Sequence, residues 1–175
     1  GTSPSPCIKA RRVIDATPAE AYALFIDDSR VSEYNANCAE LEDLVQVSQT
    51  PTSQTKVNWC ATSRFGPFKA RDFLTLVHNR DLGDSYASVA CNVELPALCP
   101  AKQNYVRSQI QLSASFFRPL PGGKTEFIQI TQVGELGGVA DSKVAKRIQD
   151  GLVLNAPVEF LTKFNEAVVR DRPII

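Results

Sequence analysis

The sequence predicts an α+β domain in which a curved antiparallel β-sheet wraps around one long carboxy-terminal helix. The order of expected elements is strand, helix, a run of strands and a final helix, which is typical of this class. Apolar and polar residues alternate most cleanly over residues 105–119, as in a strand with one wet face. Apolar residues recur at helical spacing from 148 to 168, as in a helix with one buried side.

Length, charge and cysteine usage narrow the class of protein. The 175 residues suffice for one domain, which we expect at 7–175, with 1–6 as a tag or linker remnant. The 19 basic and 19 acidic residues balance, which argues against a nucleic-acid partner. No apolar run reaches the roughly 20 residues of a spanning helix. Five scattered cysteines favour free, mostly buried thiols in the cytoplasm. We expect a soluble monomer.

The first elements have strong local signals. The segment CIKARRVIDA, residues 7–16, is typical of a strand. Thr17 can cap the following helix, Pro18 suits its first position and Glu20 completes a capping box. We therefore expect a helix near 17–27.

Several strand-like segments separated by turn signals follow this helix. They are residues 40–48, 55–63, 68–80, 85–94, 105–119 and 125–133. The turn PLPGGK makes the last two a hairpin. On the strand 105–119 the alternation places Val106, Ile110, Leu112, Ala114 and Phe116 on its apolar face. The final helix is expected from about residue 141, with interruptions at Gly151 and Pro157.

Metal sites and catalytic triads that need histidine have at most one candidate in this sequence. His78 is the only histidine, and at the end of a strand it is best interpreted as solvated. The sequence has no nucleophile elbow, zinc-protease motif or phosphate loop. We therefore predict no enzyme activity, no cofactor and no metal site. The apolar faces could line a cavity for an apolar molecule or fill a solid core, and periodicity alone leaves both open.

The sequence resembles the START lipid-transfer domains, which have a helix-grip fold. The matching segments are YNAN, FGPFKARDF, NVELP, YVR, FFRPLPGGKT and QVGELGG, in the family's order from about residue 13 to 168. Within them, Arg71 and Asp72 match the family's Arg-Asp-Phe sequence. Neighbours in a strand point to opposite faces, so we expect these two residues to be structural and to have different partners.

The resemblance implies a tunnel between the sheet and the final helix that holds one lipid or sterol-like molecule. It places the apolar face of the hairpin toward this tunnel, in agreement with the alternation. The positions implied to line the tunnel are Asn58, Cys60, Thr62, Phe73, Thr75, Val77, Tyr86, Ser88, Ala90, Ser108, Ile110, Leu112, Ile128, Ile130, Phe160, Phe164 and Val168.

Two tunnel positions depart from the family's pattern. Cholesterol-binding members carry an acidic residue and an arginine where this sequence has Asn58 and Val77. The tunnel should then be less polar, with Asn58 as a polar anchor for a ligand. The alternative is that Asn58 only satisfies a neighbouring strand or a buried water.

The predicted function is to bind, and to transfer between membranes, a single lipid or other hydrophobic molecule. We expect transient membrane contact at a gate formed by Gly134, Leu136, Gly137, Gly138 and Val139, because glycines let a loop move with little strain. An ordinary strand-to-helix turn is the alternative for this loop. Two other functions stay open: a lipid-sensing regulatory domain and a helix-grip enzyme.

Overall fold

The computed structural model describes residues 7–64, 69–134 and 143–171. Two α-helices, one 3-10 helix and eight strands form this part of the chain. In chain order they are β1 (Cys7–Ile14), α1 (Pro18–Ile26), η1 (Asp28–Glu33), β2 (Glu40–Thr50), β3 (Ser53–Ala61), β4 (Ala70–Asp81), β5 (Tyr86–Asn92), β6 (Tyr105–Arg107), β7 (Ile110–Leu120), β8 (Lys124–Val133) and α2 (Lys143–Arg170).

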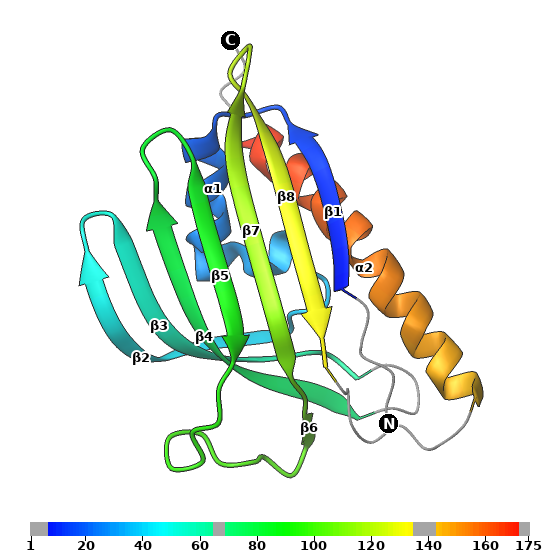
Figure 1. Cartoon of the computed structure of the whole chain (residues 1–175). Coiled ribbons are helices and arrows are strands. Elements are labelled where there is room, and N and C mark those ends of the chain that lie inside the picture. The colour runs from blue at the N-terminus through cyan, green and yellow to red at the C-terminus, as the bar shows by residue number, and fades with distance from the viewer. Residues whose placement is uncertain (1–6, 65–68, 135–142, 172–175) are drawn as a thin grey trace.

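The strands form one curved sheet, and α1 and α2 lie on the same side of it (Figure 1). The strand order is β1-β8-β7-β5-β4-β3-β2, with β6 paired to β4. Every pairing is antiparallel except that of β6 with β4. The predicted α+β class, with a curved sheet against a long final helix, is confirmed.

Helix α1 begins as its local sequence predicts. The Oγ1 of Thr17 accepts a hydrogen bond from the backbone N–H of Glu20 at 3.3 Å. The carboxylate of Glu20 accepts one from the backbone N–H of Thr17 at 2.7 Å. Both halves of the capping box are present, so this end of the helix needs no tertiary contact to satisfy its first donors.

An aromatic core fills the space between α1, α2 and one end of the sheet. Phe117 and Phe127 stack at 4.4 Å between ring centroids, and Phe164 of α2 lies 4.9 Å from Phe127. Phe25 of α1 contacts all three rings edge-on. Phe117, Phe127 and Phe164 are fully buried, so this half of the fold is solid.

Two features of the structure differ from the prediction: the division of one strand into two, and the exposure of the cysteines. The segment 105–119 is not one strand, because β6 ends at Arg107 and pairs in parallel with β4 before β7 begins at Ile110. The cysteines are free, as predicted, but their burial varies: Cys7 and Cys91 are exposed, Cys38 and Cys60 are partly buried, and Cys99 is buried.

Candidate ligand-binding cavity

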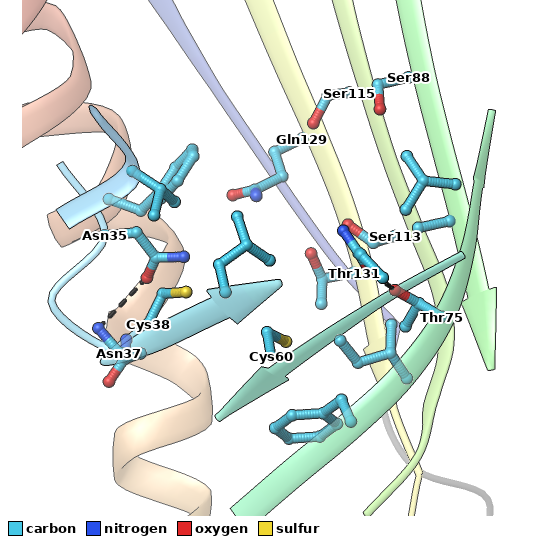
Figure 2. A pocket seen from close by; sticks show the side chains of 18 of the residues that line it. Asn35, Asn37, Cys38, Cys60, Thr75, Ser88, Ser113, Ser115, Gln129 and Thr131 are labelled. Carbon is cyan, nitrogen blue, oxygen red and sulfur yellow. Dashed lines mark hydrogen bonds between the residues drawn. The ribbon is translucent and has the colours of Figure 1, made fainter. Parts of the chain in front are cut away.

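A cavity of about 490 Å³ lies between the concave face of the sheet, η1 and the part of α2 that begins at Ala156. Figure 2 shows side chains from several strands converging on it. The sheet positions on its wall include Lys56, Asn58, Cys60, Thr62, Arg71, Phe73, Thr75, Val77, Asn79, Ser88, Ala90, Ile110, Ser113, Ser115, Gln129 and Thr131. The wall is mixed, with an apolar body and polar groups in defined places.

More than half of the predicted tunnel positions border this cavity. They come from β3 and the residue that follows it, from β4 and β5, from the start of β7 and from α2. These residues are Asn58, Cys60, Thr62, Phe73, Thr75, Val77, Ser88, Ala90, Ile110 and Phe160. On β3 and β4 the inner face is the one expected from the resemblance.

The facing of the hairpin is the reverse of the prediction along most of its length. The pairing of β7 with β8 shifts between Ile110 and Leu112. Such a bulge changes which face the following residues occupy. Ile110 borders the cavity, but beyond the bulge Ser113 and Ser115 do so and Leu112 does not. On β8, Gln129 and Thr131 border it, whereas Ile128 and Ile130 do not.

Four other predicted tunnel residues lie outside the cavity. Tyr86, Phe164 and Val168 belong to the aromatic core or pack against it. Tyr86 stacks on Tyr22 at 4.5 Å between ring centroids. Ser108 is fully buried, and its hydroxyl donates to the carbonyl of Val106 at 3.3 Å. The residues thus divide between a solid half and a hollow half, a division that periodicity does not reveal.

A row of polar side chains crosses the sheet at the boundary between these halves. Asn79 of β4 is paired with Ser88 of β5, Ser88 with Ser115 of β7, and Ser115 with Gln129 of β8. All four border the cavity, and Figure 2 shows the last three pointing toward it. Two residues away along the strands, Phe117 and its neighbours form the solid core. The row is therefore the closed end of the cavity.

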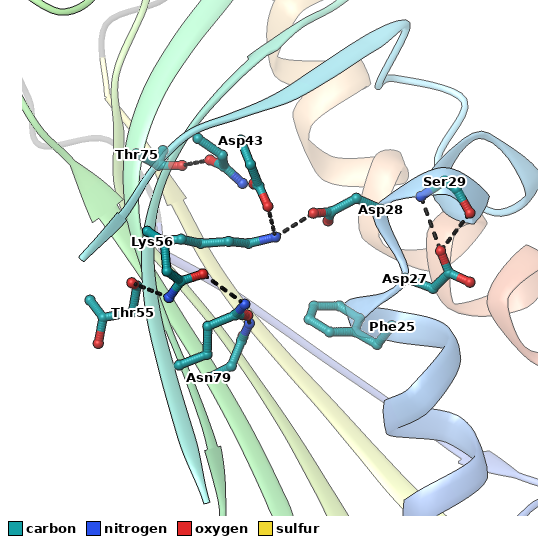
Figure 3. Close-up of polar contacts among 12 residues, drawn as sticks. Phe25, Asp27, Asp28, Ser29, Asp43, Thr55, Lys56, Thr75 and Asn79 are labelled. Carbon is teal, nitrogen blue, oxygen red and sulfur yellow. Dashed lines mark hydrogen bonds and ion pairs between the residues drawn. The ribbon is translucent and has the colours of Figure 1, made fainter. Parts of the chain in front are cut away.

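Lys56 is the main cavity residue that the sequence analysis missed. Its ammonium group pairs with Asp28 of η1 and, at 2.8 Å, with Asp43 of β2 (Figure 3). Lys56 is only 4% exposed, and it borders the cavity together with Asp28. Lys56 lies on the same face of β3 as Asn58 and Cys60. Extending that alternation by two residues toward the start of the strand would therefore have predicted Lys56 as a cavity residue.

The charges of this cluster have opposite responses to burial. Burial by itself lowers the pKa of Lys56, but its hydrogen bonds to Asp28 and Asp43 outweigh this effect and raise it. Burial raises the pKa of Asp28 despite the hydrogen bond from Lys56. Lys56 is therefore a charged ammonium at neutral pH, and it is a titratable group on the wall of the cavity.

Two cysteines on the cavity wall are protonated thiols. Burial raises the pKa of Cys60 to about 12 and that of Cys38 to about 11. A thiol needs its thiolate form to act as a nucleophile. Neither residue is activated by its surroundings in this structure.

Asn58 is hydrogen-bonded to the neighbouring strand. Its carbonyl oxygen accepts a bond of 2.5 Å from the hydroxyl of Thr75. This contact is the alternative role that the sequence left open for Asn58. What Asn58 can still offer a ligand is its amide N–H₂ group.

Arg71 and Asp72 lie on opposite faces of β4, as predicted. Arg71 borders the cavity, and its guanidinium donates to the carbonyl of Lys69 at 2.8 Å. Asp72 lies on the other face, 1% exposed, and accepts hydrogen bonds from Trp59 at 2.8 Å and Arg107 at 2.9 Å. The two residues therefore have separate partners.

The predicted gate lies almost wholly outside the described residues. Leu136, Gly137, Gly138 and Val139 belong to the segment that the structure leaves undescribed. Gly134 is described: it is buried, and its N–H donates to the carbonyl of Gln109 at 2.8 Å. The gate stays a prediction.

Two searches of the described residues concern other kinds of site. Within residues 7–64, 69–134 and 156–171, no group of three or more histidine, cysteine, aspartate or glutamate side chains is placed to hold a metal ion. No helix in the described part of the chain is both long and apolar enough to cross a membrane.

Known structures resemble this fold over nearly its whole length. Human StAR-related lipid transfer protein 5 matches with a TM-score of 0.79 and 23% identity, over 94% of this chain and 76% of that one. Human STARD10 matches with a TM-score of 0.79 and 19% identity, over 94% and 64% of the two chains. The Zhui aromatase/cyclase of Streptomyces sp. R1128 matches with a TM-score of 0.56 and 11% identity, over 94% of each.

The sequence itself matches one protein family. Comparison with curated protein sequences gave no match. The START domain family, in contrast, matches residues 2–155. This match spans most of the chain and agrees with the curved sheet, the long final helix and the cavity between them. The chain belongs to the START domain family.

Proposed function

We propose that this domain binds one lipid or other hydrophobic small molecule in its cavity and transfers it between membranes. The observation that carries the proposal is the cavity of about 490 Å³ between the sheet and α2. A largely apolar pocket of this size with a few placed polar groups suits an apolar ligand. One human structure that shares the fold is named a StAR-related lipid transfer protein.

Burial of the ligand supplies the driving force. Removing roughly 400 Å² of apolar ligand surface from water gives on the order of 10 kcal/mol before ordering costs. Such a gain allows a protein cavity to compete with a membrane for the molecule. The proposed contacts are the predicted positions that border the cavity, namely Asn58, Cys60, Thr62, Phe73, Thr75, Val77, Ser88, Ala90, Ile110 and Phe160.

We infer binding rather than catalysis from the state of the cavity's reactive groups. The thiols of Cys38 and Cys60 are protonated, and Lys56 is a charged ammonium held by two carboxylates. A lysine acts as a nucleophile or base only when its amine is neutral. The cyclase among the similar structures shares the fold at 11% identity, which carries no chemistry over to this chain.

A variant that fills the cavity and a matched control on the opposite face of the sheet test the proposal. Ala90 borders the cavity between Val77 and Ser113, whereas Ala87 is on the opposite face of the same strand, β5. We expect Ala90→Phe to reduce the affinity for a pyrene-labelled long-chain alcohol at least tenfold and Ala87→Phe to leave it within about twofold. Transfer of the same probe between vesicles should fall in parallel.

Two outcomes would contradict the proposal. One is that the wild-type protein binds no apolar probe. The other is that Ala87→Phe and Ala90→Phe weaken binding equally. Independently of these variants, mass spectrometry of organic extracts from the purified protein would identify the molecule that the cell supplies.

A further inference from the structure

Asn79, on the wall of the cavity, has a hydrogen-bond acceptor that is not used. The residue is 5% exposed and borders the cavity from the inner face of β4. Its Oδ1 is buried and has no hydrogen-bond partner among the described residues. A buried acceptor without a partner is costly, so such groups in folded proteins usually have a ligand or water to bind.

A chain of side-chain amides decides that the free atom of Asn79 is its oxygen. The N–H₂ group of Gln46 donates to the carbonyls of Ser48 at 2.6 Å and Thr55 at 3.0 Å, which can only accept. Gln46 Oε1 therefore accepts from the N–H₂ of Gln54 at 3.1 Å. Gln54 Oε1 in turn accepts from the N–H₂ of Asn79 at 3.2 Å. The oxygen of Asn79 is therefore the atom left without a partner among the described residues.

The groups beside Asn79 can complete a site for a hydroxyl. Ser88 and Ser115 follow it in the cross-strand row at the closed end of the cavity, and both are buried. Serine hydroxyls both donate and accept. A ligand hydroxyl that donates to Asn79 can therefore accept from a serine, which satisfies both of its functions.

The charges nearest this end disfavour an anion. Lys56, on the strand next to Asn79, is already paired with Asp28 and Asp43. With both carboxylates ionised, the cluster of one ammonium and two carboxylates is net negative. An anionic group would meet this charge and the acceptor oxygen of Asn79 without a free cation from the cluster.

We propose that Asn79, with Ser88 and Ser115, forms a subsite at the closed end of the cavity for a neutral hydroxyl group of an otherwise apolar ligand. The inference rests on the proposed binding function and adds the chemical class and orientation of the ligand: an alcohol that enters with its hydroxyl first. Specificity for alcohols over ethers follows, because an ether leaves the oxygen of Asn79 without a donor.

Three probes with one apolar body test the subsite: 10-(1-pyrenyl)decanol, its methyl ether and the corresponding decanoic acid. We expect the wild-type protein to bind the alcohol about tenfold more tightly than the ether or the ionised acid in fluorescence titrations at neutral pH. Asn79→Leu should bring the alcohol-to-ether ratio close to one and leave ether affinity within twofold. The matched control is Asn92→Leu on β5, a half-buried residue outside the cavity wall, which should keep the wild-type ratio.

A second variant tests the orientation of the amide. Gln54→Leu removes the acceptor that holds the N–H₂ group of Asn79. The amide can then turn and donate to an ether, so the alcohol-to-ether ratio should fall while Asn79 is still present. This variant also serves if Asn79→Leu fails to fold.

The outcomes separate the subsite from the function on which it rests. If the wild-type protein binds neither alcohol nor ether, the proposed binding function is wrong. If it binds both equally, or if Asn79→Leu keeps the wild-type ratio, binding stands and the hydroxyl subsite is overturned. Preference for the acid would also overturn it.

Discussion

Asp72 on β4 accepts a hydrogen bond of 2.9 Å from the guanidinium of Arg107 on β6, where the two strands run parallel. The same carboxylate oxygen accepts a bond of 2.8 Å from the indole N–H of Trp59 on β3. One buried charge therefore joins three strands on the face of the sheet opposite the cavity. We therefore expect Asp72 to have a structural role, whereas the neighbouring Arg71 lies on the cavity side.

Loss of the Arg107 side chain should destabilise the domain. Arg107→Met leaves Asp72 buried without its cation, so we expect the free energy of unfolding in urea to fall by about 3 to 5 kcal/mol. The matched control is Arg11→Met, because Arg11 forms an exposed ion pair with Glu126 at 3.7 Å, and we expect a loss of at most about 1 kcal/mol. Equal losses for the two variants would show that the buried ion pair stabilises the fold no more than the exposed one.

Replacement of Lys56 should leave the carboxylates of Asp28 and Asp43 without their shared cation, so that they repel each other. We expect Lys56→Met to lower the free energy of unfolding by about 1 to 3 kcal/mol at pH 7, a range reduced because both carboxylates are partly exposed. The difference from wild type should shrink as pH falls and the carboxylates gain protons. Adding Asp28→Asn should restore part of the loss; if it causes a further full loss instead, repulsion is not the cause.

Glu33 should make the stability of the domain depend on pH in the acid range. Its hydrogen bonds with Arg30, and those with Arg170, lower the pKa of Glu33 from 4.5 to about 2. A lowered pKa in the folded state stabilises the fold fully above the unfolded value and progressively less as pH falls through the folded value. The contribution is therefore present above about pH 4.5 and lost toward pH 2.

Melting temperatures measured from pH 7 to pH 2 check this expectation. Glu33→Gln should melt below the wild type at pH 7, and the two curves should converge toward pH 2. The exposed Glu94→Gln is the control and should follow the wild type throughout. A constant difference between Glu33→Gln and wild type across this range would rule out the ionised carboxylate as the cause.

Two phenylalanines of α2, one turn apart, should separate stability from binding. Phe164 is fully buried in the aromatic core, whereas Phe160 borders the cavity. We expect Phe164→Ala to lower the free energy of unfolding by about 3 to 5 kcal/mol. Phe160→Ala should cost less stability and weaken binding of the pyrenyl alcohol more. Urea denaturation and fluorescence titration measure both quantities, and the reverse order would place the cavity elsewhere.

The reversed facing of the hairpin shows where prediction from the sequence ended. Its alternation was visible, and the natural interpretation put Leu112, Ile128 and Ile130 inside. The bulge near Leu112 instead turns Ser113 inward with the polar side of the strand. A bulge has no residue signature here that would reveal it in advance, and one extra residue reverses every side chain beyond it.

The sequence by itself determined the parts of this protein whose cause is local or periodic: the capped start of α1, the succession of strands, the long final helix and, through its resemblance to START domains, the fold. Only the tertiary structure decided which inner-face residues fill a solid core and which border a cavity. It also brought Lys56 to Asp28, and aligned Asn79 with Ser88 and Ser115. The physical reason is that strand pairing joins residues far apart in the chain, and that alternation records which residues share a face but not what lies against it.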